Sequence, residues 1–299
     1  MWVIRSTIST NGHQWRKAPL EGASGAPIDL LPFLKWAGGK RWLTQQYRAL
    51  LATNFERYIE PFLGSGAVFF HLQPDQSILG DSNAELINTY RQIRRDWRAV
   101  QRALRRHHKN HNKIYYYEER VREHTAAHEK AAQFIYLNRT CWNGLYRVNL
   151  RGEFNVPKGT KTAVILETDD FARTASALRG ATLVVDDFER VIGRAGEDDF
   201  AFIDPPYITR HNFNGFVKYN DQLFCWSDQE RLAQAVRRAA RRGVKLLITN
   251  AAHQSIRDLY AGVGEHHEIH RNSLLAANSE KRGLTTEIAI TINYKGSAD

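Results

Sequence analysis

The sequence predicts an α/β fold in which a Rossmann-like, mainly parallel sheet carries a small inserted helical and hairpin domain. Short apolar runs typical of buried strands alternate with stretches of helical periodicity, and the first run ends in a glycine turn. The alternation breaks between about residues 105 and 165. We therefore expect an N-terminal extension over residues 1–30, a main domain over 31–104 and 165–299, and the inserted domain over 105–164.

The main domain opens with two candidate binding segments. Residues 33–40, Phe-Leu-Lys-Trp-Ala-Gly-Gly-Lys, are typical of a binding loop and also of an ordinary turn. Residues 57–66 predict a strand and a glycine turn, with a helix after it, and the glycines allow the backbone to approach a ligand closely. A second strand, 77–81, ends in Asp81, where an acid typically binds ribose hydroxyls. The pocket therefore favours a nucleoside, without clear provision for pyrophosphate.

Residues 84–106 predict a helix with one buried face, because apolar residues recur at spacings of three and four. These are Leu86, Tyr90, Ile93, Trp97, Val100 and Leu104. The other faces are rich in arginine, which is typical of a solvated face and also of a surface that contacts phosphates. The arginines are Arg91, Arg94, Arg95, Arg98, Arg102, Arg105 and Arg106.

The inserted domain ends in a segment without helical period, residues 138–159, which mixes aromatic side chains with Asn, Arg and Gly. Asn143-Gly144 and Arg151-Gly152 are turn signals. Aromatic rings beside Arg and Asn suit stacking on bases and contacts with base edges. A β-hairpin with an aromatic cluster of its own is the alternative interpretation.

The C-terminal half predicts further strands and one long helix. The strands are 181–185, 200–203, 244–249 and 287–292. The helix begins at Ser227, with Glu230 three residues later as a capping box, and stops near Gly243. Strands that alternate with helices predict a mainly parallel sheet.

Asp204-Pro205-Pro206-Tyr207 directly follow the strand 200–203, where open α/β sheets bind their ligands. The prolines stiffen the turn, and because proline has no backbone N–H, the turn offers carbonyl acceptors without the corresponding donors. Asp204 and the Pro205 carbonyl can accept the two hydrogens of an exocyclic amine, and Tyr207 can stack on the ring that bears it. Adenine N6 and cytosine N4 are both such amines. A proline-rich turn with a polar cap is the structural alternative.

Composition favours an anionic partner. The formal net charge is +10 with a pI near 9.6, and nucleic acid is the commonest partner of such chains. Cys141 and Cys225 stand far apart without a second ligand at metal spacing, so neither zinc site nor disulfide is predicted, and a reducing cytoplasm fits. No apolar window is long enough for a membrane span, and the N-terminus lacks the apolar core of a signal peptide.

Taken together, these segments resemble the Dam-type DNA adenine-N6 methyltransferases, the D12 class of the α group. The resemblance extends from about Phe33 to Tyr294. It is carried by five boxes in the family's order: Phe-Leu-Lys-Trp-Ala-Gly-Gly-Lys at 33–40, Glu-Pro-Phe-x-Gly-x-Gly at 60–66, Asp-x-Asn at 81–83, the Asn-Gly-Leu-x-Arg…Gly-Glu-Phe-Asn-Val-Pro hairpin at 143–157, and Asp-Pro-Pro-Tyr at 204–207. The run Phe216…Tyr219…Phe224…Ser227-Asp228-Gln229 also fits.

The resemblance implies S-adenosyl-L-methionine as cofactor and double-stranded DNA as partner. The catalytic residues it implies are Asp204, Pro205, Pro206 and Tyr207. The cofactor-binding residues are Trp36, Lys40, Glu60, Pro61, Phe62, Gly64, Ser65, Gly66, Asp81 and Asp204. The DNA-binding residues are Lys35, Trp142, Asn143, Leu145, Arg147, Asn149, Asn155 and Pro157. No metal is implied, and the flipping chemistry does not require a dimer.

The target and the biological setting are less closely defined. Relatives with Leu, Arg and Pro at the positions of Leu145, Arg147 and Pro157 tend to recognise GATC, whereas Trp142 and Tyr146 depart from the usual pattern, as does Lys158. Cytosine-N4 methylation, RNA base methylation and a catalytically silent DNA-binding protein are the alternatives. A role beside a cognate restriction endonuclease, in marking a host chromosome, or on a phage or plasmid remains open.

Overall fold

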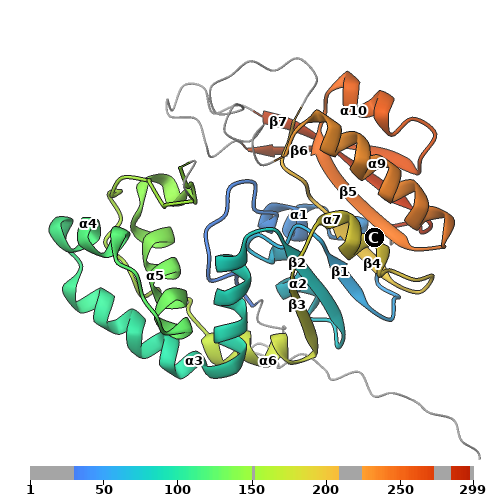
Figure 1. The fold of residues 1–299 in the computed structure, drawn as a ribbon. Coiled ribbons are helices and arrows are strands. Elements are labelled where there is room, and N and C mark those ends of the chain that lie inside the picture. Colours follow the sequence, from blue (N-terminus) through green and yellow to red (C-terminus); the bar gives the residue numbers. More distant parts are fainter. Residues whose placement is uncertain (1–29, 150–151, 209–223, 273–283, 297–299) are drawn as a thin grey trace, which may run out of the picture.

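A computed structural model describes residues 30–149, 152–208, 224–272 and 284–296, and within these ranges it confirms the mainly parallel sheet. The expected N-terminal extension and the Phe216 and Tyr219 positions lie outside the described residues. Seven strands are hydrogen-bonded in the order β3-β2-β1-β4-β5-β7-β6 (Figure 1). They are β1 (Tyr58–Glu60), β2 (Ser77–Asp81), β3 (Ala181–Val185), β4 (Phe200–Ile203), β5 (Lys245–Ala251), β6 (Glu265–Asn272) and β7 (Leu284–Ile292).

The strand order reverses between β1 and β4, which pair in parallel with Tyr58 opposite Phe200. From β1 the chain proceeds outward through β2 and β3, and from β4 it proceeds the other way through β5. Such a reversal leaves a crevice at the carboxyl ends of the two central strands, and ligands of open α/β sheets bind there. Strand β7 is antiparallel to both β5 and β6, so the far edge of the sheet ends in an antiparallel ribbon.

Helices cover both faces of the sheet, because successive strand residues point to opposite sides. Tyr58 belongs to the core cluster on one face and Ile59 to the cluster on the other. The first face is covered by α1 (Arg41–Gln46), α2 (Ala67–Leu72), α3 (Ala84–Asn110) and α6 (Phe171–Ala177). The second is covered by α7 (Phe188–Gly193), α9 (Trp226–Arg241) and α10 (Gln254–Leu259). None of the described helices is long and apolar enough to cross a membrane.

The inserted lobe is mostly helical and lies beside the sheet (Figure 1). Helix α3 continues through the expected boundary near residue 105, with a non-helical Asp96, and leads into α4 (Lys113–Val121) and α5 (Ala127–Thr140). In the segment that follows, the described pairing is limited to two isolated bridges, Cys141 with Lys158 and Val148 with Phe154. The hairpin is therefore present in outline, without a regular ladder among its described residues.

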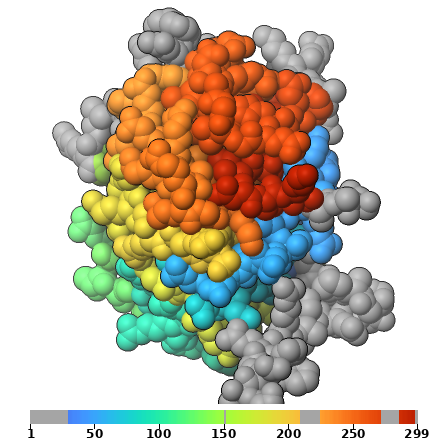
Figure 2. All heavy atoms as spheres, turned by 90° about the vertical axis from the view of Figure 1, so that its right-hand side faces the viewer, coloured from blue at the N-terminus to red at the C-terminus, as the bar shows by residue number. Residues whose placement is uncertain are grey.

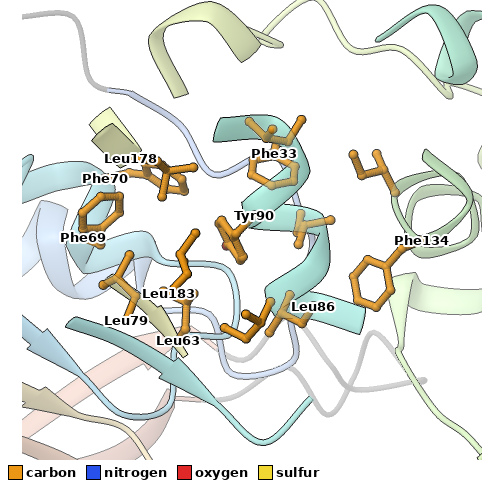
Figure 3. Packing of buried hydrophobic residues seen from close by; sticks show 14 of the residues in the cluster. Phe33, Leu63, Phe69, Phe70, Leu79, Leu86, Tyr90, Phe134, Leu178 and Leu183 are labelled. Atoms are coloured by element: carbon orange, nitrogen blue, oxygen red, sulfur yellow. The ribbon is translucent and has the colours of Figure 1, made fainter. Parts of the chain in front are cut away.

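The segment before α1 is fastened to the first core. Figure 3 shows the ring of Phe33 beside Tyr90 of α3, and the two rings meet edge to face with centroids 5.3 Å apart. The Arg139 guanidinium, 1% exposed, donates to the Phe33 carbonyl at 2.8 Å and forms two bonds with Asp169. At the other end of the chain, the Tyr294 hydroxyl donates to the Leu50 carbonyl at 2.6 Å, and Figure 2 shows the red C-terminal residues beside this blue segment.

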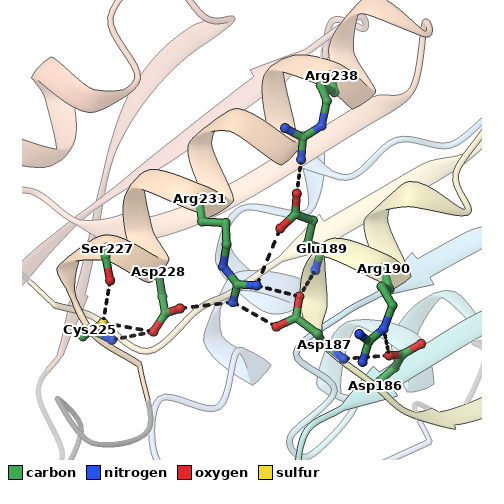
Figure 4. Close-up of polar contacts among 9 residues, drawn as sticks. All are labelled: Asp186, Asp187, Glu189, Arg190, Cys225, Ser227, Asp228, Arg231 and Arg238. Carbon is green, nitrogen blue, oxygen red and sulfur yellow. Dashed lines mark hydrogen bonds and ion pairs between the residues drawn. The ribbon is translucent and has the colours of Figure 1, made fainter.

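The long C-terminal helix begins earlier than expected. Its first residue is Trp226, and the cap is Cys225, whose N–H donates to the Asp228 carboxylate at 3.0 Å. The expected capping box of Ser227 with Glu230 is wrong, because Glu230 instead accepts from the Trp226 indole N–H at 2.8 Å. Asp228 also belongs to an ion-pair network, in which Arg231 reaches Asp187 and Glu189 at the start of α7 (Figure 4).

Candidate active site

The glycine turn after β1 is held by a carboxylate at the end of β2. Gly64, at φ +48°, donates its N–H to Asp81 Oδ2 at 3.1 Å, and the Asn83 N–H donates to Oδ1 at 2.9 Å. The Tyr90 hydroxyl donates to the Gly64 carbonyl at 3.0 Å. Burial raises the pKa of Asp81, and the two backbone donors oppose this rise. The sequence-predicted Asp81 therefore fixes the turn.

Trp36 covers this turn. A β-carbon at Gly64 would lie 2.7 Å from Cδ1 of the Trp36 ring, so the close approach requires glycine. The same indole stacks on Tyr146 at 5.9 Å and on Phe134 at 6.4 Å between ring centroids. Three rings thus connect the turn to the inserted lobe.

The remaining predicted cofactor residues surround the same turn. Pro61, Ser65 and Gly66 are buried. Phe62 is half-buried and stacks on Phe188 with centroids 5.4 Å apart. The turn is therefore rigid, with aromatic side chains at its border.

Asp204 follows the last residue of β4, and its carboxylate accepts from two donors. The Thr249 hydroxyl of β5 donates to Oδ1 at 2.7 Å, and the Lys40 ammonium lies 2.8 Å from the same oxygen. Burial raises the pKa of Asp204, whereas the positive charge of Lys40 and its hydrogen bond lower it. Both of these contacts are made by Oδ1 of the carboxylate.

Lys40 is buried and was expected to contact a cofactor. Its ammonium donates to the Gly38 carbonyl at 2.8 Å and lies 4.9 Å from the centre of the Tyr207 ring, over one face. It also lies 3.8 Å from a carboxylate oxygen of Glu287 in β7. The structure thus places Lys40 among the Asp-Pro-Pro-Tyr residues as well as beside the loop before α1.

The Pro206 carbonyl and the Tyr207 hydroxyl are bound by side chains outside the predicted site residues. The Tyr207 hydroxyl donates to Glu287 Oε2 at 2.6 Å. The Gln229 side-chain amide, fully buried in α9, donates to the Pro206 carbonyl at 3.4 Å, and Asn250 donates to Gln229 Oε1 at 3.3 Å. Asn250 and Glu287 are polar residues within or beside apolar strand runs, and this was the available signal.

Glu60, the last residue of β1, is a second buried carboxylate nearby. Tyr58 donates its hydroxyl to Oε2 at 2.9 Å. Burial raises the pKa of Glu60 well above its usual range, the Tyr58 bond opposes this, and the charge of Asp204 adds to it. Burial therefore raises the pKa of both Glu60 and Asp204, and at Asp204 the Lys40 charge opposes the rise.

The predicted DNA-binding residues gather at one end of the inserted lobe. Lys35 is exposed, and its backbone N–H and carbonyl both pair with the Asn138 side chain, at 2.9 and 2.7 Å. Its aliphatic stem packs against Gly144, where a β-carbon would lie 2.9 Å away. Trp142 is 51% exposed, and its backbone N–H donates to the Pro157 carbonyl at 2.9 Å.

The rest of that segment is ordered by side-chain pairs. Arg147 donates through Nε to Asn155 Oδ1 at 2.8 Å, and Asn149 donates to the Glu153 carboxylate at 2.7 Å. Asn143 is exposed at φ +55°, and Leu145 is half-buried. The structure thus brings Lys35 together with residues 142–149 and 152–157, which lie more than 100 residues further along the chain.

Some of the arginines have structural partners. In α3, Arg91 donates to the Leu183 carbonyl at 2.7 Å and Arg94 to the Ala181 carbonyl at 2.5 Å, both along β3. In α9, Arg231 lies over the Phe188 ring at 4.4 Å and joins the acidic network of Figure 4. These three positively charged side chains therefore have structural roles within the protein, and no contact with phosphate is needed to explain them.

Comparison with known proteins identifies the family of this chain. A model of the family "D12 class N6 adenine-specific DNA methyltransferase" matches residues 36–274. The chain is 33% identical over 276 residues to the type II methyltransferase M1.LlaDCHI of Lactococcus lactis subsp. cremoris, covering 89% of this chain and 96% of that protein. It is 34% identical to the type II methyltransferase M.MjaIII of Methanocaldococcus jannaschii (75% and 85% covered) and 30% identical to the DNA adenine methylase of Haemophilus influenzae (86% and 92% covered). The chain belongs to the D12 class of N6 adenine-specific DNA methyltransferases.

Proposed function

We propose that this DNA adenine methyltransferase transfers a methyl group from S-adenosyl-L-methionine to adenine N6 at a short site in double-stranded DNA, with GATC as the favoured target. The observation that carries the proposal is the position of Asp204. It directly follows β4, the strand that pairs with β1, and its Oδ1 is bound by Thr249 and Lys40, so we assign Oδ2 to a substrate amine.

The residues around the turn fit a nucleoside-bearing cofactor. Gly64 exposes backbone where a β-carbon has no room, Asp81 stands at the end of β2, and the Trp36 and Phe62 rings border the turn. When bound, S-adenosyl-L-methionine supplies a methyl group on a positively charged sulfur. Trp36, Lys40, Asp81, Asp204 and residues 60–66 would hold it.

The Asp-Pro-Pro-Tyr residues suit an amine that is a weak nucleophile. The lone pair of adenine N6 is delocalised into the ring, and two acceptors on its hydrogens return electron density to nitrogen. Asp204 Oδ2 and the Pro205 carbonyl are those acceptors, and proximity supplies much of the remaining acceleration. Burial raises the pKa of Asp204, and the positive charge of Lys40 opposes this rise and so favours the charged state that accepts hydrogen bonds.

The target base must leave the helix to reach this site, at a cost of about a few kcal/mol. The Lys40 ammonium covers one face of the Tyr207 ring, so a base would stack on the opposite face. Stacking of a base on an aromatic ring recovers about 1–3 kcal/mol. The segment from Trp142 to Pro157, together with Lys35, is the surface that we assign to sequence recognition.

The test is to incubate the protein with unmethylated genomic DNA and S-adenosyl-L-methionine and to sequence the product for modified bases. N6-methyladenine at one short motif supports the proposal, and GATC supports the assignment of the recognition segment. N4-methylcytosine would overturn the choice of base while keeping the fold. We expect Asp204→Ala to lose most turnover, whereas the exposed Glu265→Ala serves as a matched carboxylate control.

A further inference from the structure

Glu287 is a buried carboxylate with no place in the boxes that carry the family resemblance. It lies in β7 and is 1% exposed. In the register of the sheet it is opposite Ala251 of β5, two residues beyond Thr249, so Glu287 and Thr249 point to the same face. This is the face on which Thr249 reaches Asp204, and β7 therefore brings a second acid to the Asp-Pro-Pro-Tyr residues.

Two contacts of this acid bear on the Asp-Pro-Pro-Tyr residues. The Tyr207 hydroxyl donates to Glu287 Oε2 at 2.6 Å, and the Lys40 ammonium lies 3.8 Å from the same oxygen. Lys40 in turn covers one face of the Tyr207 ring. The ring is thus fixed at its hydroxyl end by Glu287 and on one face by Lys40.

Packing alone gives no reason for an acid here. The next residue of β7 on this face is Ala289, which is part of the apolar core. A buried carboxylate is costly unless it is paired and hydrogen-bonded. A tyrosine that presents one face to a mobile base, by contrast, binds that base more tightly when its ring plane is already fixed. The rotational freedom that the ring has lost in the free protein is then not lost again on binding.

We propose that Glu287 is a positioning residue that orients the Tyr207 ring to receive the target adenine. The inference rests on the proposed function, because it assigns Tyr207 to the extruded base. Glu287 does not touch the reacting atoms. Its carboxylate holds the phenol, and the phenol sets the plane on which the base stacks.

Binding to two duplexes, measured without cofactor, isolates this role. One labelled duplex carries a mispaired adenine at the target position, so that little unpairing is required, and the other carries an abasic residue there. Fluorescence anisotropy gives the affinity for each. The ratio of the affinity for the adenine duplex to the affinity for the abasic duplex reports the contact between the base and its pocket. All other contacts are shared by the two duplexes.

We expect Glu287→Ala and Tyr207→Phe each to lower this ratio roughly tenfold, and the double variant to lower it no further, since both remove the same bond. Glu287→Gln keeps an acceptor for the phenol and should retain most of the ratio. Glu265→Ala, an exposed acid on the neighbouring strand, should leave it unchanged. Tyr207→Phe keeps the ring and removes only its hydroxyl, so it remains informative if Glu287→Ala folds poorly.

Two results would overturn the inference. A Glu287→Ala variant that loses affinity equally for both duplexes would show that the acid only supports the fold, and an unchanged ratio in Tyr207→Phe would show that the bond does not set the ring. The same preparations are assayed for methyl transfer. A wild-type protein that leaves adenine unmodified refutes the proposed function. If the wild type methylates adenine but the affinity ratios of the variants equal that of the wild type, this inference alone is refuted.

Discussion

Substitution of Gly64 by alanine tests the cofactor turn most directly. Gly64 has φ +48°, and a side chain in this left-handed region costs about 1–2 kcal/mol. The new β-carbon would also lie 2.7 Å from Cδ1 and 2.9 Å from Nε1 of Trp36, so the indole must move. That movement disturbs its stacking on Tyr146 and Phe134, and each such pair contributes about 0.5–1.5 kcal/mol.

These contributions together reach roughly 2–5 kcal/mol, part of which falls on cofactor binding and part on stability. Because 1.4 kcal/mol corresponds to about a tenfold change in an equilibrium constant, we expect Gly64→Ala to bind S-adenosyl-L-methionine about tenfold more weakly or worse. Isothermal titration calorimetry measures the affinity. Gly193→Ala is the matched control, because nothing lies within 4 Å of its β-carbon position. Affinity within twofold of wild type in Gly64→Ala would refute this account of the turn.

Three further substitutions test the charges of the site and its support. Lys40→Met removes the charge that lowers the pKa of Asp204 against burial, so the acid limb of the kcat/KM–pH profile should move to higher pH, and a limb that stays in place contradicts the assignment. Arg139→Met leaves the Asp169 carboxylate, 4% exposed, without its partner, and urea denaturation should show a loss of about 3–5 kcal/mol. Arg147→Ala should reduce discrimination at one base of the site by about 1–3 kcal/mol, as measured by methylation kinetics on cognate and single-mismatch duplexes.

The central strands could be predicted because their sequences leave little choice. Phe200–Ile203 is a short apolar run that ends in Asp-Pro-Pro, and the structure has β4 over those residues. Ser77–Asp81 likewise forms β2 as expected. The edge strand β6 was missed, because Glu265–Asn272 contains a single aliphatic residue and three histidines and shows no apolar alternation. Its pairing with β7 decides its conformation, and pairing is not visible in local sequence.

The motifs of the site could be predicted from the sequence, whereas the side chains that bind the motif residues could not. Asp204 and Tyr207 stand out because they follow an apolar strand. Thr249 and Glu287, which bind them, are 45 and 80 residues further along the chain, and only the register of β5 and β7 brings them close. Sequence spacing carries no information about such contacts, whereas the sheet order fixes them.

The arrangement of charges around Lys40 explains why one carboxylate can serve as acceptor while another lies close by. Glu60 and Asp204 are both buried acids, and burial raises the pKa of each. The Lys40 ammonium is bonded to Asp204 at 2.8 Å, and this contact opposes the effect of burial at that residue. Glu60 has the Tyr58 hydroxyl in place of a cation, and the charge of Asp204 adds to the rise in its pKa. The Lys40 cation therefore opposes the effect of burial at Asp204, at the end of β4 where an amine hydrogen needs an acceptor, whereas Glu60 lacks such a cation.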